Sequence, residues 1–204
     1  MKKKELSLGP DVIQLLIPHR RPFIMVDRVV QFDLEPAPTL KSVKYLTGNE
    51  SFFSGHFPKI ALMPGAMTFE GLGQSVNITS VIMALRDLYE KENRNPDEVY
   101  DDLQNLEYAF TLNPAYKKEK TDFLKQLMGN HTENLYGLVG SVNLKFLEPI
   151  SAGNLVEYEV VRTGTLDNYM HYDIIATVNG RVKAKGKMSS IHGLDILKDS
   201  YFAR

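Results

Sequence analysis

Apolar positions along the chain follow two different periods, and their order predicts a short helix and then strands. Residues 9–17 carry apolar side chains at helical spacing and end at Pro18, which predicts a short amphipathic helix. Residues 22–32 and 39–47 are rich in β-branched and aromatic side chains and flank a proline-containing turn. These two segments are therefore predicted to form an antiparallel pair of strands.

The next segment, over about residues 66–92, has helical character but lacks a charged stripe. Between residues 66 and 84 Glu70 is the only charged side chain, and Thr, Gln, Ser and Asn are mixed among apolar residues. A helix without a charged face is normally enclosed by the rest of its domain, so we expect this helix at the centre of the fold. Gly71 and Gly73 each weaken helix propensity by about 1 kcal/mol relative to alanine, which indicates close packing against a sheet or a ligand.

Residues 86–134 then change to a charged, helical composition. Asn95-Pro96 followed by two acidic residues has the pattern of a helix start, Asn113-Pro114 repeats it, and Gly129 is suited to end the second helix. We expect these two helices to form an inserted arm outside the core. Deleting residues 90–132 should accordingly preserve the fold.

After Tyr136 the pattern returns to strands. Asn179-Gly180 between two of them is the strongest two-residue hairpin signal in the chain. A single sheet wrapped around one central helix accommodates every predicted element, so we expect residues 1–204 to form one α+β domain. The four predicted strands cover residues 136–149, 154–164, 168–179 and 181–192.

Composition and charge narrow the functional classes. The 204 residues are 43% hydrophobic, enough for one sizeable core, and 24 basic side chains nearly balance 25 acidic ones. This balance argues against a nucleic-acid-binding protein that depends on a strong positive field. No apolar stretch approaches the ~18 residues that span a bilayer, and no leader peptide is recognisable, so we expect no membrane insertion.

The chain contains no cysteine, which excludes disulfides, thiolate nucleophiles and cysteine-ligated metal sites. No glycine-rich phosphate loop or cluster of histidines and carboxylates at ligand spacing is present, so we expect neither a metal nor another cofactor. Together with the missing leader, this composition predicts a protein of the reducing cytoplasm.

The strongest candidate chemistry lies between residues 55 and 70. Gly55 allows close approach of a ligand beside His56, and Glu70 is a carboxylate on the helix expected to be buried. A buried carboxylate must be paired, protonated or functional, so a structural salt bridge or hydrogen bond to the sheet is the alternative. Gly65 begins that helix, where the first N–H groups have no partner within the helix. A base, an acid and such N–H groups suit proton abstraction next to a thioester carbonyl.

The other four histidines carry weaker signals. His19 precedes the first predicted strand, and a local hydrogen-bonding role is the simpler interpretation. His131, His171 and His192 fall in the arm and in the last strands or at their ends, where surface or half-buried positions are expected.

An ordered series of short motifs covers about 120 residues, 18–80 and 136–192. In chain order the motifs are Pro18-His19-Arg20, Pro22-Phe23, Val26-Asp27-Arg28, Gly55-His56-Phe57-Pro58, Met63-Pro64-Gly65, Glu70-Gly71-Leu72-Gly73-Gln74, Val142-Asn143-Leu144-Lys145-Phe146, Pro149-Ile150, Ala152-Gly153 and Ala176-Thr177-Val178-Asn179-Gly180. Their order resembles that of the β-hydroxyacyl-acyl carrier protein dehydratases of the FabZ type.

This resemblance implies a hot-dog fold and a hydro-lyase that converts a 3-hydroxyacyl thioester, carried by an acyl carrier protein, to the trans-2-enoyl thioester. The pathway implied is biosynthesis of fatty acids or related acyl chains. His56 of one subunit and Glu70 of the other are implied to be catalytic in a homodimer, which in this family often assembles further into a trimer of dimers, a hexamer. Gly65 matches the position whose N–H polarises the thioester carbonyl, and Phe57 and Gln74 are expected to bind substrate. Glutamate at position 70 favours this type over the related dehydratase–isomerases.

Two features depart from the family pattern. Residues 59–62 read Lys-Ile-Ala-Leu where the family usually has Gly-Arg-Pro-Val, and the arm of residues 86–134 has no counterpart in a typical member. A hot-dog thioesterase that uses Glu70, and a non-catalytic acyl-binding or scaffold subunit, are therefore the alternatives. A basic patch near the site would steer an acidic carrier protein, although each candidate side chain is equally well explained as solvated surface. The candidates are Arg20, Arg21, Lys59 and Lys145.

Overall fold

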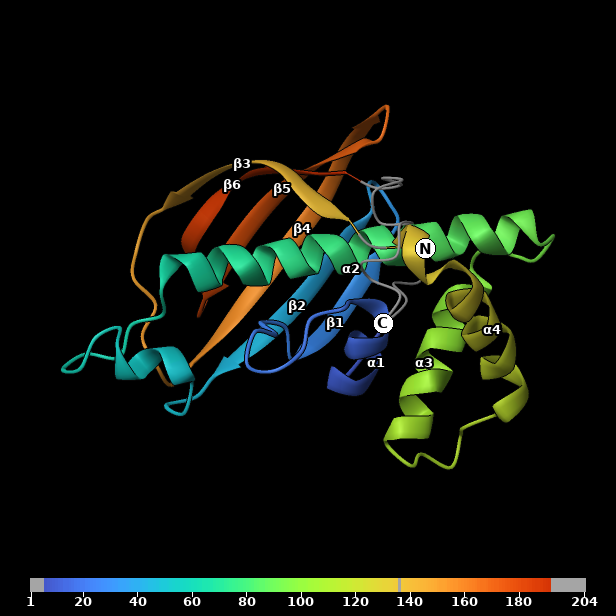
Figure 1. Ribbon diagram of the computed structural model, residues 1–204, viewed down its shortest axis with the longest axis horizontal. Coiled ribbons are helices and arrows are strands. Elements are labelled where there is room, and N and C mark those ends of the chain that lie inside the picture. Colours follow the sequence, from blue (N-terminus) through green and yellow to red (C-terminus); the bar gives the residue numbers. More distant parts are fainter. Residues whose placement is uncertain (1–5, 136, 192–204) are drawn as a thin grey trace.

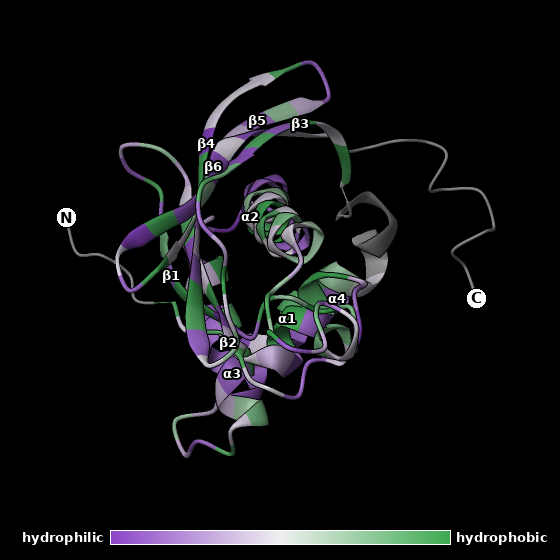
Figure 2. Ribbon diagram, turned by 90° about the vertical axis from the view of Figure 1, so that its left-hand side faces the viewer, coloured by the Kyte–Doolittle hydropathy of each residue, from purple (hydrophilic) through white to green (hydrophobic). Residues whose placement is uncertain are grey.

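The computed structural model describes residues 6–135 and 137–191, in which one curved sheet covers a long helix (Figure 1). The helix is α2 (Gly65–Lys91), and every neighbouring pair of strands is antiparallel, in the order β1-β2-β4-β5-β6-β3. Figure 2, seen nearly along α2, shows the strands curving around it, with the other helices beyond its uncovered side. The strands are β1 (Arg28–Asp33), β2 (Thr39–Leu46), β3 (Leu138–Phe146), β4 (Asn154–Leu166), β5 (Tyr169–Val178) and β6 (Arg181–Ile191).

The uncharged stretch of α2 is buried, which confirms the expectation of a central helix. Several of its hydroxyl side chains bond to the helix itself or to the sheet. Ser75 donates to the Gly71 carbonyl (2.7 Å) and pairs with Ser42 of β2 (2.8 Å), and Ser80 pairs with Tyr172 of β5 (2.6 Å). Because the hydroxyls of Ser75 and Ser80 find partners, the helix can be enclosed there without leaving these polar groups unpaired.

The two glycines of α2 have different surroundings. A Cβ placed at Gly71 would lie 2.4 Å from the buried ring of Tyr158 on β4, so close packing requires glycine there, as expected. At Gly73 the nearest atom would be Cγ2 of Val139, at 4.0 Å, which is an ordinary contact. Close packing against the sheet therefore does not require glycine at position 73, and the alternative of a ligand there stays a prediction.

The inserted arm is part of the core, contrary to our expectation. It consists of α3 (Glu98–Phe110) and α4 (Lys118–Leu135), which pack against each other and against the end of α2. Tyr89 of α2 is fully buried, and its ring meets Phe123 of α4 edge-on at 5.0 Å. Six apolar residues of α3 and α4 lie in the same buried cluster as the sheet interior, namely Val99, Tyr100, Leu103, Leu106, Leu124 and Leu127. The last turns of α2 extend past the sheet, and the arm covers them.

A second connection joins the arm to α1 (Pro10–Leu16). The buried carboxylate of Glu107 on α3 accepts a hydrogen bond from the N–H of Gly9 (2.7 Å) and lies 3.4 Å from the guanidinium of Arg28. The helix start at Pro10 and the first strand are therefore both tied to the arm.

Most predicted elements are confirmed, but the arm helices begin later than expected. The side chains of Asn95 and Asn113 each accept a hydrogen bond from the backbone N–H two residues on (3.0 and 2.9 Å). These asparagines therefore form turns before the helices rather than capping them. Gly129 lies within α4 rather than at its end.

The predicted hairpin at Asn179-Gly180 is confirmed, since both residues have positive φ (50° and 72°), as a two-residue type I′ turn requires. The first strand begins at Arg28 rather than at residue 22. The backbone N–H of Met25 and the carbonyl of Phe23 bond instead to the side chain of Gln74. Of the helices in residues 6–135 and 137–191, none is both long and apolar enough to cross a membrane.

Candidate active site

His56 lies in a tightly bonded loop between a short 3-10 helix (Ser51–Ser54) and α2. Its N–H donates to the Phe52 carbonyl (2.9 Å), and its own carbonyl accepts from the N–H of Leu62 (3.1 Å). The imidazole is half-buried and stacks on the exposed ring of Phe57, with 4.1 Å between ring centroids. Local backbone bonds therefore fix the position of the imidazole, and Phe57 contacts it directly.

The hydrogen bond of the His56 ring determines its tautomer. Nδ1 lies 3.0 Å from the Leu62 carbonyl oxygen, which can only accept. Nδ1 of the neutral ring must therefore carry the hydrogen, and Nε2 is left with a lone pair. An imidazole oriented in this way has the form of a general base that acts through Nε2.

Glu70 lies in the second turn of α2 with its side chain 19% exposed. Its Oε1 accepts a hydrogen bond from Nε2 of Gln74 (2.8 Å) and is 3.4 Å from Nε2 of His19. Within the described residues, no hydrogen bond reaches its second oxygen, Oε2. The partners of Glu70 are thus a helix neighbour and a loop residue. Neither is a hydrogen bond to the sheet, whereas the contact with His19 has the geometry of the salt bridge considered as the structural alternative.

The side chain of Gln74 forms hydrogen bonds to three other protein groups. Its side chain is buried, its Oε1 accepts from the Met25 N–H (2.7 Å), and its Nε2 donates to the Phe23 carbonyl (2.9 Å) as well as to Glu70. Both amide hydrogens are used. These contacts orient the Glu70 carboxylate and the preceding loop, and the substrate contact expected of Gln74 stays a prediction.

Gly65 is the first residue of α2, after Pro64, and no described residue accepts a hydrogen bond from its N–H. Beside it opens a cleft of about 340 Å³. A Cβ at Gly65 would lie 3.1 Å from the ring of Phe146 at the wall of this cleft, so a larger residue would crowd it. Met63, Gly65, Thr68, Phe146, Pro149 and Ile150 are among the lining residues. An N–H at the positive end of a helix suits a developing oxyanion.

The described contacts bring some of the expected site residues together and leave others apart. Glu70 is joined to Gln74, and His56 to Phe57. Within the described part of the single chain, no hydrogen bond or ion pair joins His56 to Glu70, and neither residue lines the cleft at Gly65.

Sequence reasoning missed the relation of His19 to this site. The pattern around His19 gave only a local hydrogen-bonding role, whereas its ring lies next to Glu70, 51 positions later in the chain. A motif that spans Pro18 to Phe23 was the available signal, but no spacing rule connects it to the helix. His171 is exposed as expected, while the side chains of His131 and His192 fall outside what the structure describes.

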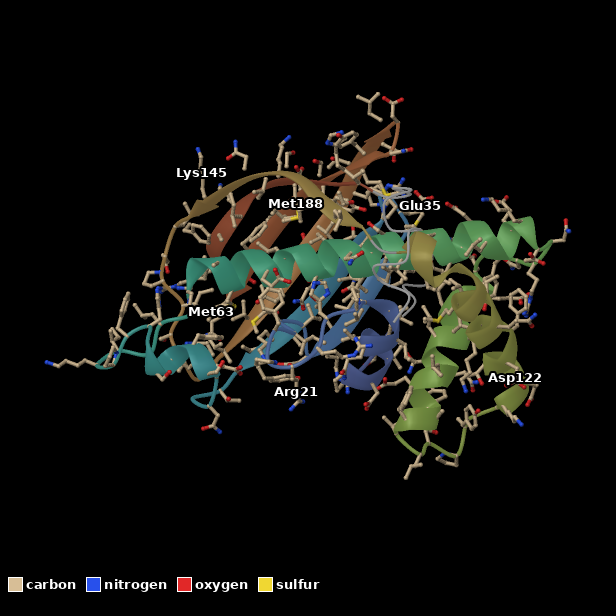
Figure 3. All side chains as sticks on the ribbon, viewed as in Figure 1. Arg21, Glu35, Met63, Asp122, Lys145 and Met188 are labelled. Atoms are coloured by element: carbon tan, nitrogen blue, oxygen red, sulfur yellow. The ribbon has the colours of Figure 1, made fainter. Side chains whose placement is uncertain are left out.

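The four basic candidates are exposed. The Arg20 guanidinium donates to the carbonyls of Ile17 (2.9 Å) and His19 (2.8 Å), so it also stabilises its own loop. Lys145 on β3 stands opposite Lys185 on β6, and Figure 3 shows its side chain pointing out from the sheet. Arg21 and Lys59 lie in the loops before β1 and after His56.

Comparisons with known proteins find relatives described as dehydratases. A curated 3-hydroxyacyl-[acyl-carrier-protein] dehydratase FabZ from Xanthomonas campestris is 42% identical over 87 residues, which are 43% of this chain and 56% of the relative. A FabZ of the same description from Burkholderia thailandensis is 27% identical over 188 residues, 92% of this chain and 90% of the relative. The matched region thus spans little more than half the length of the first of these relatives.

Among solved structures, the dehydratase heterocomplex ApeI:P from Xenorhabdus doucetiae superposes with a TM-score of 0.54. It is 8% identical and covers 91% of this chain and 93% of that chain, so the likeness is one of fold. The antiparallel sheet around one long helix is the hot-dog fold that the motifs implied.

A family model described as a FabA-like domain matches residues 17–119, half of the chain. The matched range holds His19, His56, Gly65, Glu70 and Gln74, although it ends before the strand motifs of the second half. On this match and the shared fold, the chain belongs to the FabA-like family.

Proposed function

We propose that this protein is a hydro-lyase that dehydrates a 3-hydroxyacyl thioester to the trans-2-enoyl thioester. The observation that carries the proposal is the hydrogen bond between His56 Nδ1 and the Leu62 carbonyl, because it leaves Nε2 free of hydrogen and able to accept a proton. His56 precedes helix α2 in the chain. The first N–H groups of α2 have no partner in the helix, and its second turn carries Glu70. This combination suits removal of a proton next to a carbonyl and loss of a hydroxyl.

In the reaction, Nε2 of His56 takes the proton from C2 of the acyl chain. The electron pair of that C–H bond forms the C2–C3 double bond, while the bond from C3 to its hydroxyl breaks. Glu70 in its acid form donates a proton to the departing hydroxyl, which leaves as water. The N–H of Gly65 donates a hydrogen bond to the thioester oxygen, where negative charge develops as C2 loses its proton. In the reverse direction each residue takes the opposite role.

We further propose that the working form is a homodimer, in which His56 of one subunit faces Glu70 of the partner subunit. The β3 edge of the sheet supports this, because among the described residues no strand lies beyond β3 and most residues of β3 are exposed. Val139 and Val142 on this edge are 46% and 45% exposed. A bare apolar edge readily pairs with another strand, and an antiparallel second copy of β3 would satisfy its backbone groups.

The proposed substrate is carried by an acyl carrier protein, as the names of the curated relatives indicate for those enzymes. The exposed basic side chains Arg21, Lys59 and Lys145 would attract such an acidic carrier. Chains made in fatty acid biosynthesis are the substrate class proposed.

The ultraviolet absorbance of the enoyl thioester tests the activity directly. The wild-type chain is supplied with 3-hydroxyacyl thioesters of short and medium length, beside Glu70→Gln and His56→Ala. We expect turnover by the wild type and its loss, by at least ~100-fold, in both variants, with the oligomer unchanged by size-exclusion chromatography. Release of free thiol without enoyl product would instead identify a thioesterase, and acyl binding without turnover a non-catalytic subunit.

The dimer is tested by Val142→Lys, which places a charge on the open edge of β3. We expect a monomer that no longer turns over substrate. Val182→Lys is the matched control because it places the same charge on an exposed valine of β6, which is an inner strand rather than the edge of the sheet. A monomeric wild type with full activity would contradict the shared site.

A further inference from the structure

We propose that His19 is a positioning residue that holds the Glu70 carboxyl group in place for proton transfer to the substrate. This inference rests on the proposed dehydratase function. It assigns a role to a side chain that lies 51 positions before Glu70 in the chain and belongs to a different element, the loop between α1 and β1.

Glu70, Gln74, Phe23 and His19 form a closed ring of contacts that includes the Glu70 carboxyl group. Gln74 Nε2 donates one hydrogen to Glu70 Oε1 (2.8 Å) and the other to the Phe23 carbonyl (2.9 Å). The Phe23 ring stacks on the His19 ring at 6.1 Å and 17°, and His19 Nε2 lies 3.4 Å from Oε1 of Glu70. The His19 imidazole and the Gln74 amide therefore both contact the same carboxyl oxygen, Oε1 of Glu70.

The consequence for Glu70 is a division between its two oxygens. Oε1 has two neighbours that hold it, whereas Oε2 has no hydrogen-bond partner within the described residues. Oε2 is therefore the oxygen available to the substrate hydroxyl. The distance of 3.4 Å is long for a hydrogen bond, and contacts of this kind often shorten only when the substrate is bound.

The charge state of His19 suits this role. Burial lowers the pKa of His19, the nearby Glu70 carboxylate raises it, and Arg20 lowers it, with burial the largest effect. A neutral imidazole can donate from Nε2 to an ionised carboxylate or, as the other tautomer, accept from a protonated one. Gln74 can only donate through its nitrogen. His19 can therefore hold Glu70 in both protonation states of the reaction cycle.

Steady-state kinetics of the full chain test the proposal. His19→Leu removes both ring nitrogens, and His19→Gln keeps a donor at the same number of bonds from the backbone as Nε2. We expect kcat to fall about 10–100-fold in His19→Leu with KM changed less than about 3-fold, since misplacing a catalytic group by ~1 Å costs that much. His19→Gln should recover most of the lost kcat. His171→Leu on the exposed face of β5 is the matched control and should retain wild-type rates.

A second measurement tests the contact without relying on activity. The imidazole of His19 is titrated by 15N NMR in the wild type and in Glu70→Gln. Because the Glu70 carboxylate raises the pKa of His19, its removal should lower that pKa. An unchanged pKa would overturn the proposal, as would a kcat in His19→Leu within about 2-fold of wild type, or a folded His19→Gln that is no better than His19→Leu.

The two measurements separate the two proposals. If the wild type fails to dehydrate any thioester, the proposed function is wrong and the catalytic role of His19 falls with it. The NMR result then shows whether the His19–Glu70 pair is a structural contact. If the wild type turns over and His19→Leu raises KM while kcat is unchanged, His19 binds substrate and is not a positioning residue.

Discussion

Replacing Gly71 by alanine tests the packing of α2 against the sheet. The new Cβ would stand 2.4 Å from Cζ and Oη of Tyr158, whereas ordinary contacts begin at 3.4 Å. One of the two groups must therefore move by about 1.0 Å. Neither can do so freely, because Tyr158 is 1% exposed and lies on a strand paired on both sides.

The expected cost follows from two opposing effects. Overpacking of a filled core typically costs about 1–3 kcal/mol, and this overlap with a fixed ring belongs at the upper end. Alanine is more favourable than glycine in a helix by about 1 kcal/mol, which offsets part of the overpacking cost. The net loss in the free energy of unfolding is therefore about 2 kcal/mol, which for a chain of this size lowers Tm by about 4–8 °C.

Thermal unfolding followed by circular dichroism, at one protomer concentration, measures this change. Gly73→Ala on the same helix is the matched control, because its new Cβ would meet nothing closer than 4.0 Å. That variant should keep the wild-type Tm or raise it by about 2–4 °C through helix propensity. If both variants shifted Tm equally, or if Gly71→Ala were the more stable, the packing argument would be refuted.

Two further predictions concern the arm. Deleting residues 90–132 should abolish cooperative unfolding, because the deletion removes the apolar cover of the end of α2, and a sharp melting transition in the deleted chain would contradict this. Burial raises the pKa of Asp102 above its ordinary value of 3.8. Between the unfolded-state and folded-state pKa values of Asp102, the folded state therefore binds more protons than the unfolded state, and the free energy of unfolding falls as the pH rises. Asp102→Asn should therefore gain stability relative to wild type as the pH rises above that ordinary value, and an equal Tm difference between the two proteins at every pH would show that Asp102 does not titrate in this way.

The elements that depend on local signals were predictable from the sequence. The type I′ turn at Asn179-Gly180 needs only two residues with positive φ, and the uncharged face of α2 follows from composition alone. The first strand was predicted six residues too early, because nothing near residue 22 indicates that Gln74 will take the backbone groups of Phe23 and Met25.

The site was predictable in part for the same reason. His56, Gly65 and Glu70 stand in short motifs that can be read along the chain, whereas the contact between His19 and Glu70 exists only after folding. The burial of the arm also depends on tertiary structure, since Leu103 and its neighbours look like one face of an ordinary amphipathic helix until α2 is seen to extend past the sheet.

The length of α2 has a consequence for the dynamics of the molecule. The same helix begins at Gly65 beside the cleft and ends at Lys91, where it packs against α3 and α4. Amide hydrogens along its middle turns can exchange with solvent only when sheet and arm both release it, so they should report one common opening free energy. If the opening extends along the whole helix, a binding event or a mutation on the arm should also change exchange protection in the turns that carry Glu70 and Gln74, so we expect the arm and the site to open as one cooperative unit.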